Sequence, residues 1–194
     1  MKNLKQNTKV WLITGKPGIG KTTVLMKTIH LIRMHGYAIG GMLSREVRVK
    51  GERTGFELID LASGRKGLLA SIKFKTGPRL GKYRVNLIDL VEIGVGGLLN
   101  AIDFCDVIVC DEIGPMELFS PDFKRAVKTI IQSGKPIFGV IHKRFNEPFI
   151  QEIKSEPFVE VIEVTLENRA KLPEILAERI LSMIRSEFNA NKNM

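Results

Sequence analysis

Long hydrophobic runs are missing from this chain of 194 residues, and cysteine is scarce. No apolar stretch approaches the roughly 20 residues that a membrane-spanning helix needs. The segment Met1 to Lys9 is polar and basic, and the apolar run after it is only a strand long, so we expect no signal peptide. The two cysteines, Cys105 and Cys110, are not spaced as metal ligands. We therefore expect two core thiols in a cytoplasmic protein that does not contact a membrane.

Acidic residues are also in short supply, with 21 Asp and Glu against 30 Lys and Arg and a formal net charge of +9. This balance suits anionic partners, either nucleotides or nucleic acid, although Lys and Arg that only solvate the surface produce the same number. A hydrophobic content of 44% is enough for one α/β domain with a full core. We predict a single domain over 1–194, with an ordered core over 9–188 and a frayed tail over 189–194.

A glycine-rich segment near the N-terminus predicts nucleotide binding. The apolar run Val10 to Thr14 leads into Gly15-Lys16-Pro17-Gly18-Ile19-Gly20-Lys21-Thr22, and a helix-forming stretch follows. This is the Gly-x-x-x-x-Gly-Lys-Thr pattern in its strand–loop–helix setting. Glycines let backbone N–H groups turn toward phosphate oxygens, and the helix adds its positive N-terminal end. We expect Lys21 to reach the β- and γ-phosphates, the Thr22 hydroxyl to ligate Mg²⁺, and Lys16 to add a local charge beside the phosphates.

A second segment supplies the acidic groups that such a site needs. Asp111 and Glu112 follow an apolar strand that consists of Val107, Ile108, Val109 and Cys110, and they precede Ile113 and Gly114. In a phosphate-loop enzyme the Asp at this position holds Mg²⁺, usually through a water molecule, while a neighbouring Glu can orient and deprotonate an attacking water. We predict those roles for Asp111 and Glu112, with Lys21 as the third catalytic group. A carboxylate that activates water favours hydrolysis over transfer to another acceptor.

The order of apolar and helix-forming segments predicts the fold. Strands are expected at 10–14, 37–43, 107–110, 136–141 and 158–164, and helices at 21–36, 87–103, 121–133, 147–154 and 168–188. Such alternation is typical of a mostly parallel sheet with helices on both faces and a mononucleotide site at the carboxyl edge of its strands. Two alternating segments, 44–50 and 53–61, predict an antiparallel hairpin inserted at the border of that sheet. The stretch 64–85 is basic and loop-rich.

The two motifs together resemble those of the thermophile-type P-loop nucleoside-triphosphatase family, whose animal relatives are called cancer-related nucleoside-triphosphatase. The segment Asp111 to Leu118 is the most discriminating part, and further matches at 53–56, 81–85 and 164–169 extend the resemblance over about 10–184. The resemblance implies a RecA-like domain that hydrolyses ATP, GTP and other triphosphates with Mg²⁺ and little base selectivity. It also implies phosphate and Mg²⁺ binding at 15–22 and a second nucleotide-binding segment at 107–114.

Several other residues allow both a functional and a structural interpretation. Glu117 could orient Glu112 or a water molecule, or it could lie on the surface before a helix. His142 could sense the γ-phosphate, and Lys143 and Arg144 could neutralise charge in the transition state, with ordinary loop residues as the alternative for all three. The segment 165–169 could contact the nucleobase or only cap the last helix.

Two rival functions use the same phosphate loop. A nucleotide or small-molecule kinase would use the basic stretch 65–84 as a lid, but it would have to keep water away from the γ-phosphate. A nucleic-acid-stimulated ATPase would use the positive charge, but this stretch offers only Phe74 and Tyr83 as stacking platforms. We therefore predict a nucleoside-triphosphatase whose partners are nucleoside triphosphates, with nucleic acid not favoured and the oligomeric state open.

Overall fold

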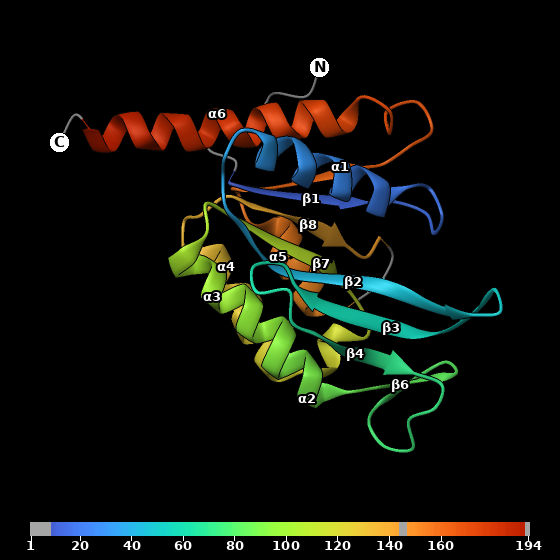
Figure 1. Cartoon of the computed structure of the whole chain (residues 1–194). Coiled ribbons are helices and arrows are strands. Elements are labelled where there is room, and N and C mark those ends of the chain that lie inside the picture. Colours follow the sequence, from blue (N-terminus) through green and yellow to red (C-terminus); the bar gives the residue numbers. More distant parts are fainter. Residues whose placement is uncertain (1–8, 144–146, 193–194) are drawn as a thin grey trace.

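The computed structural model describes residues 9–143 and 147–192, with the side chains of 187–192 left aside. Its strands form one sheet in the order β5-β6-β4-β3-β2-β7-β8-β1-β9 (Figure 1). The strands are β1 (Val10–Thr14), β2 (Ile39–Val49), β3 (Glu52–Asp60), β4 (Lys66–Ser71), β5 (Arg79–Leu80), β6 (Tyr83–Val85), β7 (Val107–Ile113), β8 (Ile137–Ile141) and β9 (Val159–Glu163). The helices are α1 (Lys21–Met34), α2 (Leu87–Asp89), the π-helical turn η1 (Leu90–Val95), α3 (Gly96–Phe104), the 3₁₀ turn η2 (Glu117–Phe119), α4 (Pro121–Gln132), α5 (Pro148–Ser155) and α6 (Leu172–Lys192).

The half of the sheet that holds the two sequence motifs is parallel. Strand β1 pairs in parallel with β8 and β9, and β7 pairs in parallel with β8 and β2. Every residue of β1 and β8 is buried, which is why both strands are continuous apolar runs and not alternating ones. The predicted parallel sheet is confirmed, and it brings the carboxyl ends of β1, β7 and β8 to one edge.

Helices cover both faces of the sheet, as predicted. Helices α1 and α6 pack over one face, and α3, α4 and α5 pack over the other (Figure 1). Alternate residues of β1 supply the two cores: Trp11 and Ile13 face α1 and α6, whereas Val10 and Leu12 belong to the opposite cluster. Both cysteines are buried and free, which agrees with the expected core thiols.

The antiparallel half corrects two expectations. The segments 37–43 and 44–50 were expected as separate strands, but β2 is one continuous strand. Its composition changes along its length because its first part lies beside β7 and its last part pairs only with β3 in a projecting hairpin. The loop-rich stretch 64–85 contains β4, β5 and β6, which lengthen the sheet beyond the hairpin. Two of these strands span only two and three residues, too few to show a periodic pattern.

Helix boundaries agree with the sequence expectations to within a few residues, with one exception. Helix α6 begins at Leu172 and not at 168, because the side chain of Asn168 closes a turn there by accepting from the N–H of Thr165 at 2.9 Å. The helix continues to Lys192, so the expected frayed tail is helical over 189–192, and 193–194 lie outside the described residues. None of the helices in the described part is long and apolar enough to cross a membrane.

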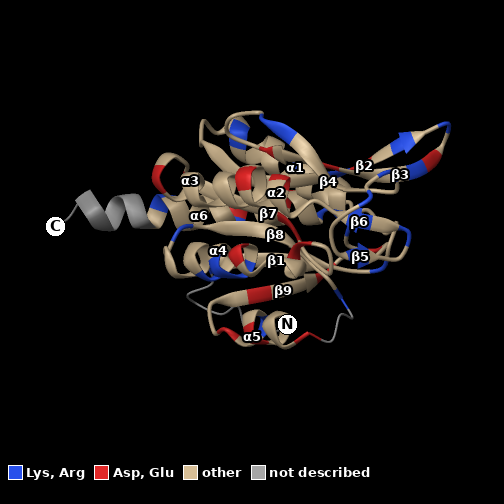
Figure 2. Ribbon diagram, turned by 90° about the horizontal axis from the view of Figure 1, so that it is seen from below, with Lys and Arg blue, Asp and Glu red and all other residues tan. Residues whose placement is uncertain are grey.

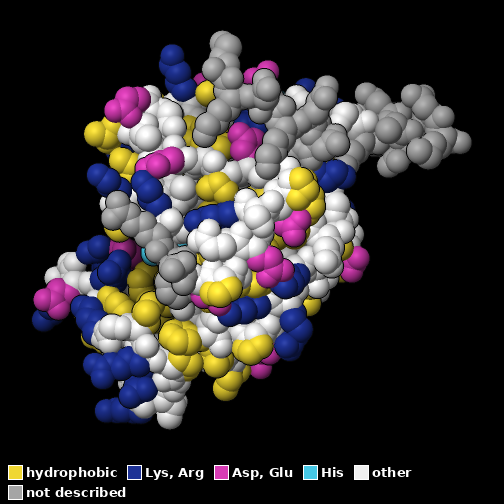
Figure 3. Space-filling model, turned by 180° about the vertical axis from the view of Figure 1, so that it is seen from behind, with side chains coloured by type: hydrophobic (Ala, Val, Ile, Leu, Met, Phe, Trp, Pro, Cys, Tyr) yellow, Lys and Arg dark blue, Asp and Glu magenta, His cyan; other side chains and the backbone are white. Residues whose placement is uncertain are grey.

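Charged side chains are unevenly distributed over the molecule. Figure 2 shows Lys and Arg concentrated on the β2–β3 hairpin and on β5 and β6. The space-filling view shows the same side of the molecule crowded with Lys and Arg around an apolar surface (Figure 3). The hairpin projects from the edge at which the parallel strands end (Figure 1), so this positive region lies next to the predicted nucleotide site.

Candidate active site

The glycine-rich segment forms the loop between β1 and α1. Gly15, Gly18 and Gly20 have φ values of 153°, 74° and 109°, which L side chains rarely adopt. At Gly15 a Cβ would also lie 3.0 Å from the Val164 carbonyl oxygen, so the backbone path needs glycine. Among the described residues, no side chain caps the N-terminus of helix α1. The N–H groups of its first turn are therefore available for an anion.

Lys21 lies over this loop. Its ammonium group donates to the carbonyl oxygens of Gly15 at 3.1 Å and Lys16 at 3.3 Å. The ammonium group is also close enough to the acid pair to act against the rise in the pKa values of Asp111 and Glu112. A bound phosphate would meet the charge of Lys21 and the backbone N–H groups together.

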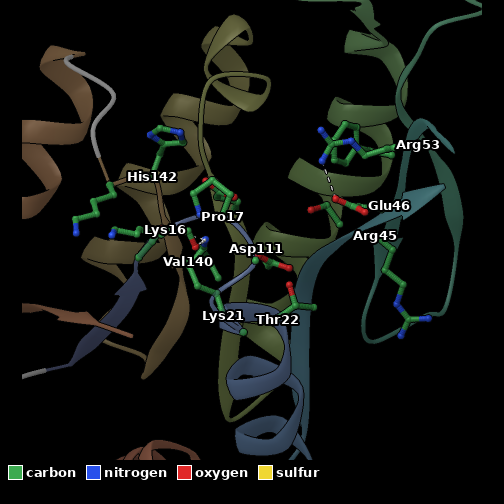
Figure 4. Close-up of a pocket in the computed structure, with 17 residues that line it drawn as sticks. Lys16, Pro17, Lys21, Thr22, Arg45, Glu46, Arg53, Asp111, Val140 and His142 are labelled. Carbon is green, nitrogen blue, oxygen red and sulfur yellow. Dashed lines mark hydrogen bonds and ion pairs between the residues drawn. The ribbon is translucent and has the colours of Figure 1, made fainter. Parts of the chain in front are cut away.

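An open cavity of about 1100 Å³ joins the loop to the other predicted groups. Three sets of residues line it: the phosphate loop, the ends of β7 and β8, and residues of the β2–β3 hairpin (Figure 4). They are Gly15, Lys16, Pro17, Gly18, Gly20, Lys21, Thr22, Ser44, Arg45, Glu46, Arg53, Phe56, Asp111, Glu112, Val140, His142 and Lys143. The two sequence motifs, about 90 residues apart in the chain, thus converge on one space.

A bulge in β7 positions the acid pair. The pairing with β8 shifts between Cys110 and Ile113, so one extra residue is accommodated at Asp111 and Glu112. Regular alternation would send these two side chains to opposite faces, whereas both line the cavity. The peptide between them is cis.

Burial shifts the protonation of the acid pair. Desolvation raises the pKa of Asp111 to about 7, with a further increase from Glu112, while Lys21 and the backbone N–H of Ser44 oppose the shift. Desolvation also raises the pKa of Glu112, and His142 and Lys21 counteract it. A cation beside Asp111 would stabilise its ionised form. A raised pKa makes Glu112 a stronger base once it is ionised.

The donor atoms at this point are suited to Mg²⁺. The Thr22 hydroxyl and the Asp111 carboxylate point toward one another across the cavity (Figure 4). Both are hard oxygen ligands, and the described residues contain no cluster of three or more carboxylate, imidazole or thiolate groups that would form a complete protein cage. Mg²⁺ typically binds through one or two protein oxygens and completes its shell with phosphate and water.

Glu117 is buried and not on the surface, which excludes the structural alternative considered for it. Its side chain is 4% exposed. A Cβ at Gly114 would lie 3.1 Å from Glu112 Oε1 and 3.2 Å from Glu117 Oε2, so both carboxyl groups border Gly114. Desolvation, with the negative charge of Glu112 next, raises the pKa of Glu117 to about 8. Glu117 is therefore a protonated carboxyl group beside the predicted base at neutral pH.

The remaining predicted residues fall into two groups. His142 and Lys143 line the cavity, although Lys143 is paired with Glu163, and Arg144 lies outside the described residues. Ile19 does not line the cavity and packs against the core, as do the residues of β7 other than the acid pair: Val107, Ile108, Val109, Cys110 and Ile113. The buried residues of β7 form the strand that carries the acid pair.

The segment 165–169 follows β9 and lies beside the phosphate loop. The amide of Asn168 is used in local turns, since it also donates to the Glu163 carbonyl at 2.8 Å. Arg169 donates to the Ile19 carbonyl at 3.2 Å. The side chain of Asn168 is therefore held in the turn that precedes α6, and Arg169 lies next to the phosphate loop. Thr165, which was expected to cap the last helix, accepts from the N–H of Asn168 at 3.3 Å, but α6 begins only at Leu172.

The sequence analysis missed the hairpin residues that line the cavity, namely Ser44, Arg45, Glu46, Arg53 and Phe56. One signal for them was available: Ser44 directly follows the apolar part of a strand, where polar residues reach the carboxyl edge of a parallel sheet. That β2 would lie next to β7 could not be inferred from local pattern, because it depends on strand order.

Comparisons with known proteins agree with this geometry. Residues 10–177 match the family model described as NTPase. A nucleoside-triphosphatase THEP1 from Thermofilum pendens is 45% identical over 177 residues, which cover 91% of this chain and 97% of that protein. The protein of the same name from Methanosarcina acetivorans is 45% identical over 170 residues, 87% of this chain and 95% of that one.

Two solved structures are also similar. The crystal structure of THEP1 from the hyperthermophile Aquifex aeolicus has a TM-score of 0.75 and 33% identity, and covers 87% of this chain and 96% of that chain. The solution structure of a human cancer-related nucleoside triphosphatase has a TM-score of 0.73 and 35% identity, and covers 87% of this chain and 95% of that chain. The similarity therefore extends over almost the full length of both structures.

Proposed function

This chain belongs to the NTPase family and is a nucleoside-triphosphatase, and from that premise we propose a Mg²⁺-dependent hydrolysis of ATP, GTP and other nucleoside triphosphates to diphosphate and phosphate. One observation supports the proposal above all others: the phosphate loop and the acid pair line the same cavity. The family resemblance and the P-loop fold expected from the sequence are confirmed by the comparisons.

In the proposed reaction the loop N–H groups and Lys21 bind the β- and γ-phosphates. Thr22 and Asp111 would hold Mg²⁺, which supplies charge neutralisation for the β- and γ-oxygens. Glu112 orients a water molecule and takes its proton while the water oxygen bonds to the γ-phosphorus. The bond from the γ-phosphorus to the bridging oxygen breaks, and the diphosphate leaves with that oxygen.

Low base selectivity follows from the nature of these contacts. Each group in the proposed reaction contacts phosphate, metal or water, and none contacts a base. Beside the loop, the side chain of Asn168 already bonds to Thr165 and Glu163, which leaves it little capacity to discriminate between bases.

The test combines substrate range with one isosteric variant. Phosphate release is measured from ATP, GTP, CTP and UTP, with and without Mg²⁺, for the natural chain and for Glu112→Gln. We expect release from all four substrates, dependence on Mg²⁺, and a decrease of about 10²–10⁴-fold in Glu112→Gln with nearly unchanged triphosphate affinity. Glu178→Gln, an exposed glutamate on α6, is the matched control and should retain full activity.

Other outcomes would favour other functions. An equal loss of affinity and turnover in Glu112→Gln would make Glu112 a structural residue. Appearance of the labelled γ-phosphate on an added nucleoside or nucleotide, with little free phosphate, would favour the kinase. Strong stimulation by polynucleotide that disappears as salt rises would favour the nucleic-acid-stimulated ATPase.

A further inference from the structure

The segment 164–171, between β9 and α6, adjoins the phosphate loop, and none of its side chains has a role in the proposed reaction. Strand β9 pairs in parallel with β1, so the chain leaves both strands at the same edge of the sheet. The N–H of Val164 donates to the carbonyl oxygen of Thr14 at 2.8 Å. A Cβ at Gly15 would lie 3.0 Å from the carbonyl oxygen of Val164. The segment therefore begins in contact with the first residue of the loop.

Hydrogen bonds fix the turn that this segment makes. The side chain of Asn168 accepts from the N–H of Thr165 at 2.9 Å and donates to the carbonyl oxygen of Glu163 at 2.8 Å. The N–H of Arg169 donates to the carbonyl oxygen of Thr165 at 3.1 Å. The backbone at Arg169 is thus held in place before any ligand binds, which lowers the entropy cost of a contact made there.

Arg169 extends from this turn across the phosphate loop. Its Nη1 donates to the carbonyl oxygen of Ile19 at 3.2 Å. Its Cδ lies 3.8 Å from the position that a Cβ at Gly20 would occupy, where the loop becomes helix α1. The side chain is exposed, and within the described residues it forms no ion pair and no cation–π contact. Its charge and the face of its guanidinium plane are therefore available to a ligand.

The contact with Ile19 places the guanidinium group on the outer side of the loop. The carbonyl of Ile19 and the N–H of Gly20 belong to one trans peptide group, so they point in opposite directions. When this N–H faces the bound phosphates, the carbonyl and Arg169 lie on the side away from them. Lys21 and the loop N–H groups already meet the phosphate charge. Arg169 is therefore placed for the part of the nucleotide that lies beyond the phosphates.

Strand order gives the direction in which that part lies. The sheet runs β7-β8-β1-β9, so the acid pair and the segment 164–171 lie on opposite sides of the phosphate loop after β1. A γ-phosphate that faces Glu112, as the proposed function requires, leaves the α-phosphate and the nucleoside on the β9 side. Arg169 contacts the loop from that side, and Figure 1 shows the segment that leads into α6 beside the loop between β1 and α1.

A guanidinium group suits a nucleoside with any base. Its plane stacks on the π-face that every base has, and this contact does not depend on the hydrogen-bonding edge of the base. The hydrogen bond from Nη1 to Ile19 orients the plane and occupies a donor that could otherwise read a base edge. Stacking on Arg169 would therefore add affinity without selecting a base, in agreement with the low base selectivity proposed above.

We propose that Arg169 is the nucleoside-binding residue of this site, with its guanidinium group stacked on the base of the triphosphate that occupies the phosphate loop. Arg169 takes no part in the chemical step, so it sets the affinity for the nucleotide and not the rate of hydrolysis. The proposal rests on the proposed function only for the direction in which the triphosphate lies.

The test compares ligands with and without a nucleoside. Calorimetry measures the binding of β,γ-imido-ATP, β,γ-imido-GTP and diimidotriphosphate, all with Mg²⁺; none of them is hydrolysed, and the last has no nucleoside. In Arg169→Ala we expect the affinity for both nucleotide analogues to fall by about tenfold, through the loss of one stacked base. The affinity for diimidotriphosphate should change by less than about threefold, since only a solvent-exposed charge is lost. The rate of phosphate release at saturating ATP should stay within about twofold of the natural value.

Two further variants separate stacking from charge. Arg169→Lys keeps the charge but not the plane, so it should also weaken both nucleotide analogues by at least about fivefold. Lys171→Ala is the matched control, because it removes an exposed charge from the same segment. It should change every affinity by less than about twofold.

Four results would overturn the proposal: unchanged nucleotide affinity in Arg169→Ala, an equal loss of nucleotide and diimidotriphosphate affinity, full nucleotide affinity in Arg169→Lys, or an equal loss in Lys171→Ala. A chain that hydrolyses triphosphates and gives any of these results refutes this inference and leaves the proposed function intact. A chain that shows the expected affinities and releases no phosphate refutes the proposed function alone. A chain that does not bind the analogues refutes both.

Discussion

Replacing Glu117 with glutamine tests whether a protonated carboxyl group lies beside the predicted base. Glu117 is buried, and its pKa is raised from 4.5 to about 8. Between these two values the folded chain holds a proton that the unfolded chain has released. The free energy of unfolding must therefore fall as pH rises from about 4.5 toward 8. The stabilising contribution of the Glu117 proton is fully present only below about pH 4.5. Glutamine has nearly the same shape and does not titrate.

The size of the effect follows from the two pKa values. Between pH 5 and pH 8, the loss of the favourable proton on Glu117 should by itself reduce the free energy of unfolding by roughly 3 kcal/mol. The slope is about 1.4 kcal/mol per pH unit over most of that interval. Asp111, with a pKa of about 7, adds a similar dependence to the natural chain and the variant alike, so it cancels in the comparison.

The assay is urea unfolding of both proteins at pH 5, 6, 7 and 8. We expect Glu117→Gln to gain stability relative to the natural chain as pH increases, with the largest difference at pH 8. The exposed Glu178→Gln is the control and should follow the natural chain at every pH. Curves for Glu117→Gln and the natural chain that remain parallel from pH 5 to pH 8 would refute the assigned proton.

Three further substitutions test the loop and its support. Lys21→Ala should abolish tight triphosphate binding in a fluorescent-nucleotide titration, whereas Lys27→Ala on the exposed face of α1 should not; unchanged affinity in Lys21→Ala would contradict the role of its charge. Gly15→Ala should destabilise the fold by about 1–3 kcal/mol and weaken triphosphate binding, because the new Cβ would lie 3.0 Å from the Val164 carbonyl at a φ of 153°. Ser120→Ala should lower the free energy of unfolding by about 1 kcal/mol without changing the rate of phosphate release at saturating substrate, since Ser120 caps α4; a loss of activity without a loss of stability would disprove that purely structural role.

Local pattern was enough to predict the two motifs and the parallel half of the sheet. The phosphate loop and the acid pair are each contiguous in sequence, and buried parallel strands leave unbroken apolar runs. Phe56 and Arg53 could not be assigned to the site in this way, because their place depends on β2 lying beside β7. Glu117 was ambiguous for a similar reason: a glutamate before a helix is normally exposed, and only tertiary packing reveals that this one is buried.

The burial of Glu117 has a consequence for the base beside it. Two carboxyl groups that both border Gly114 cannot easily be ionised together, and the one with the higher pKa keeps its proton. Glu117 has no cationic partner among the causes of its shift, whereas His142 and Lys21 both favour the ionised form of Glu112. A negative charge on Glu112, the carboxylate that lines the cavity, is thus stabilised by two cations, whereas a negative charge on Glu117 has no such partner. A protonated Glu117 adds no like charge beside Glu112, which favours the ionised form of Glu112 that a general base for water requires.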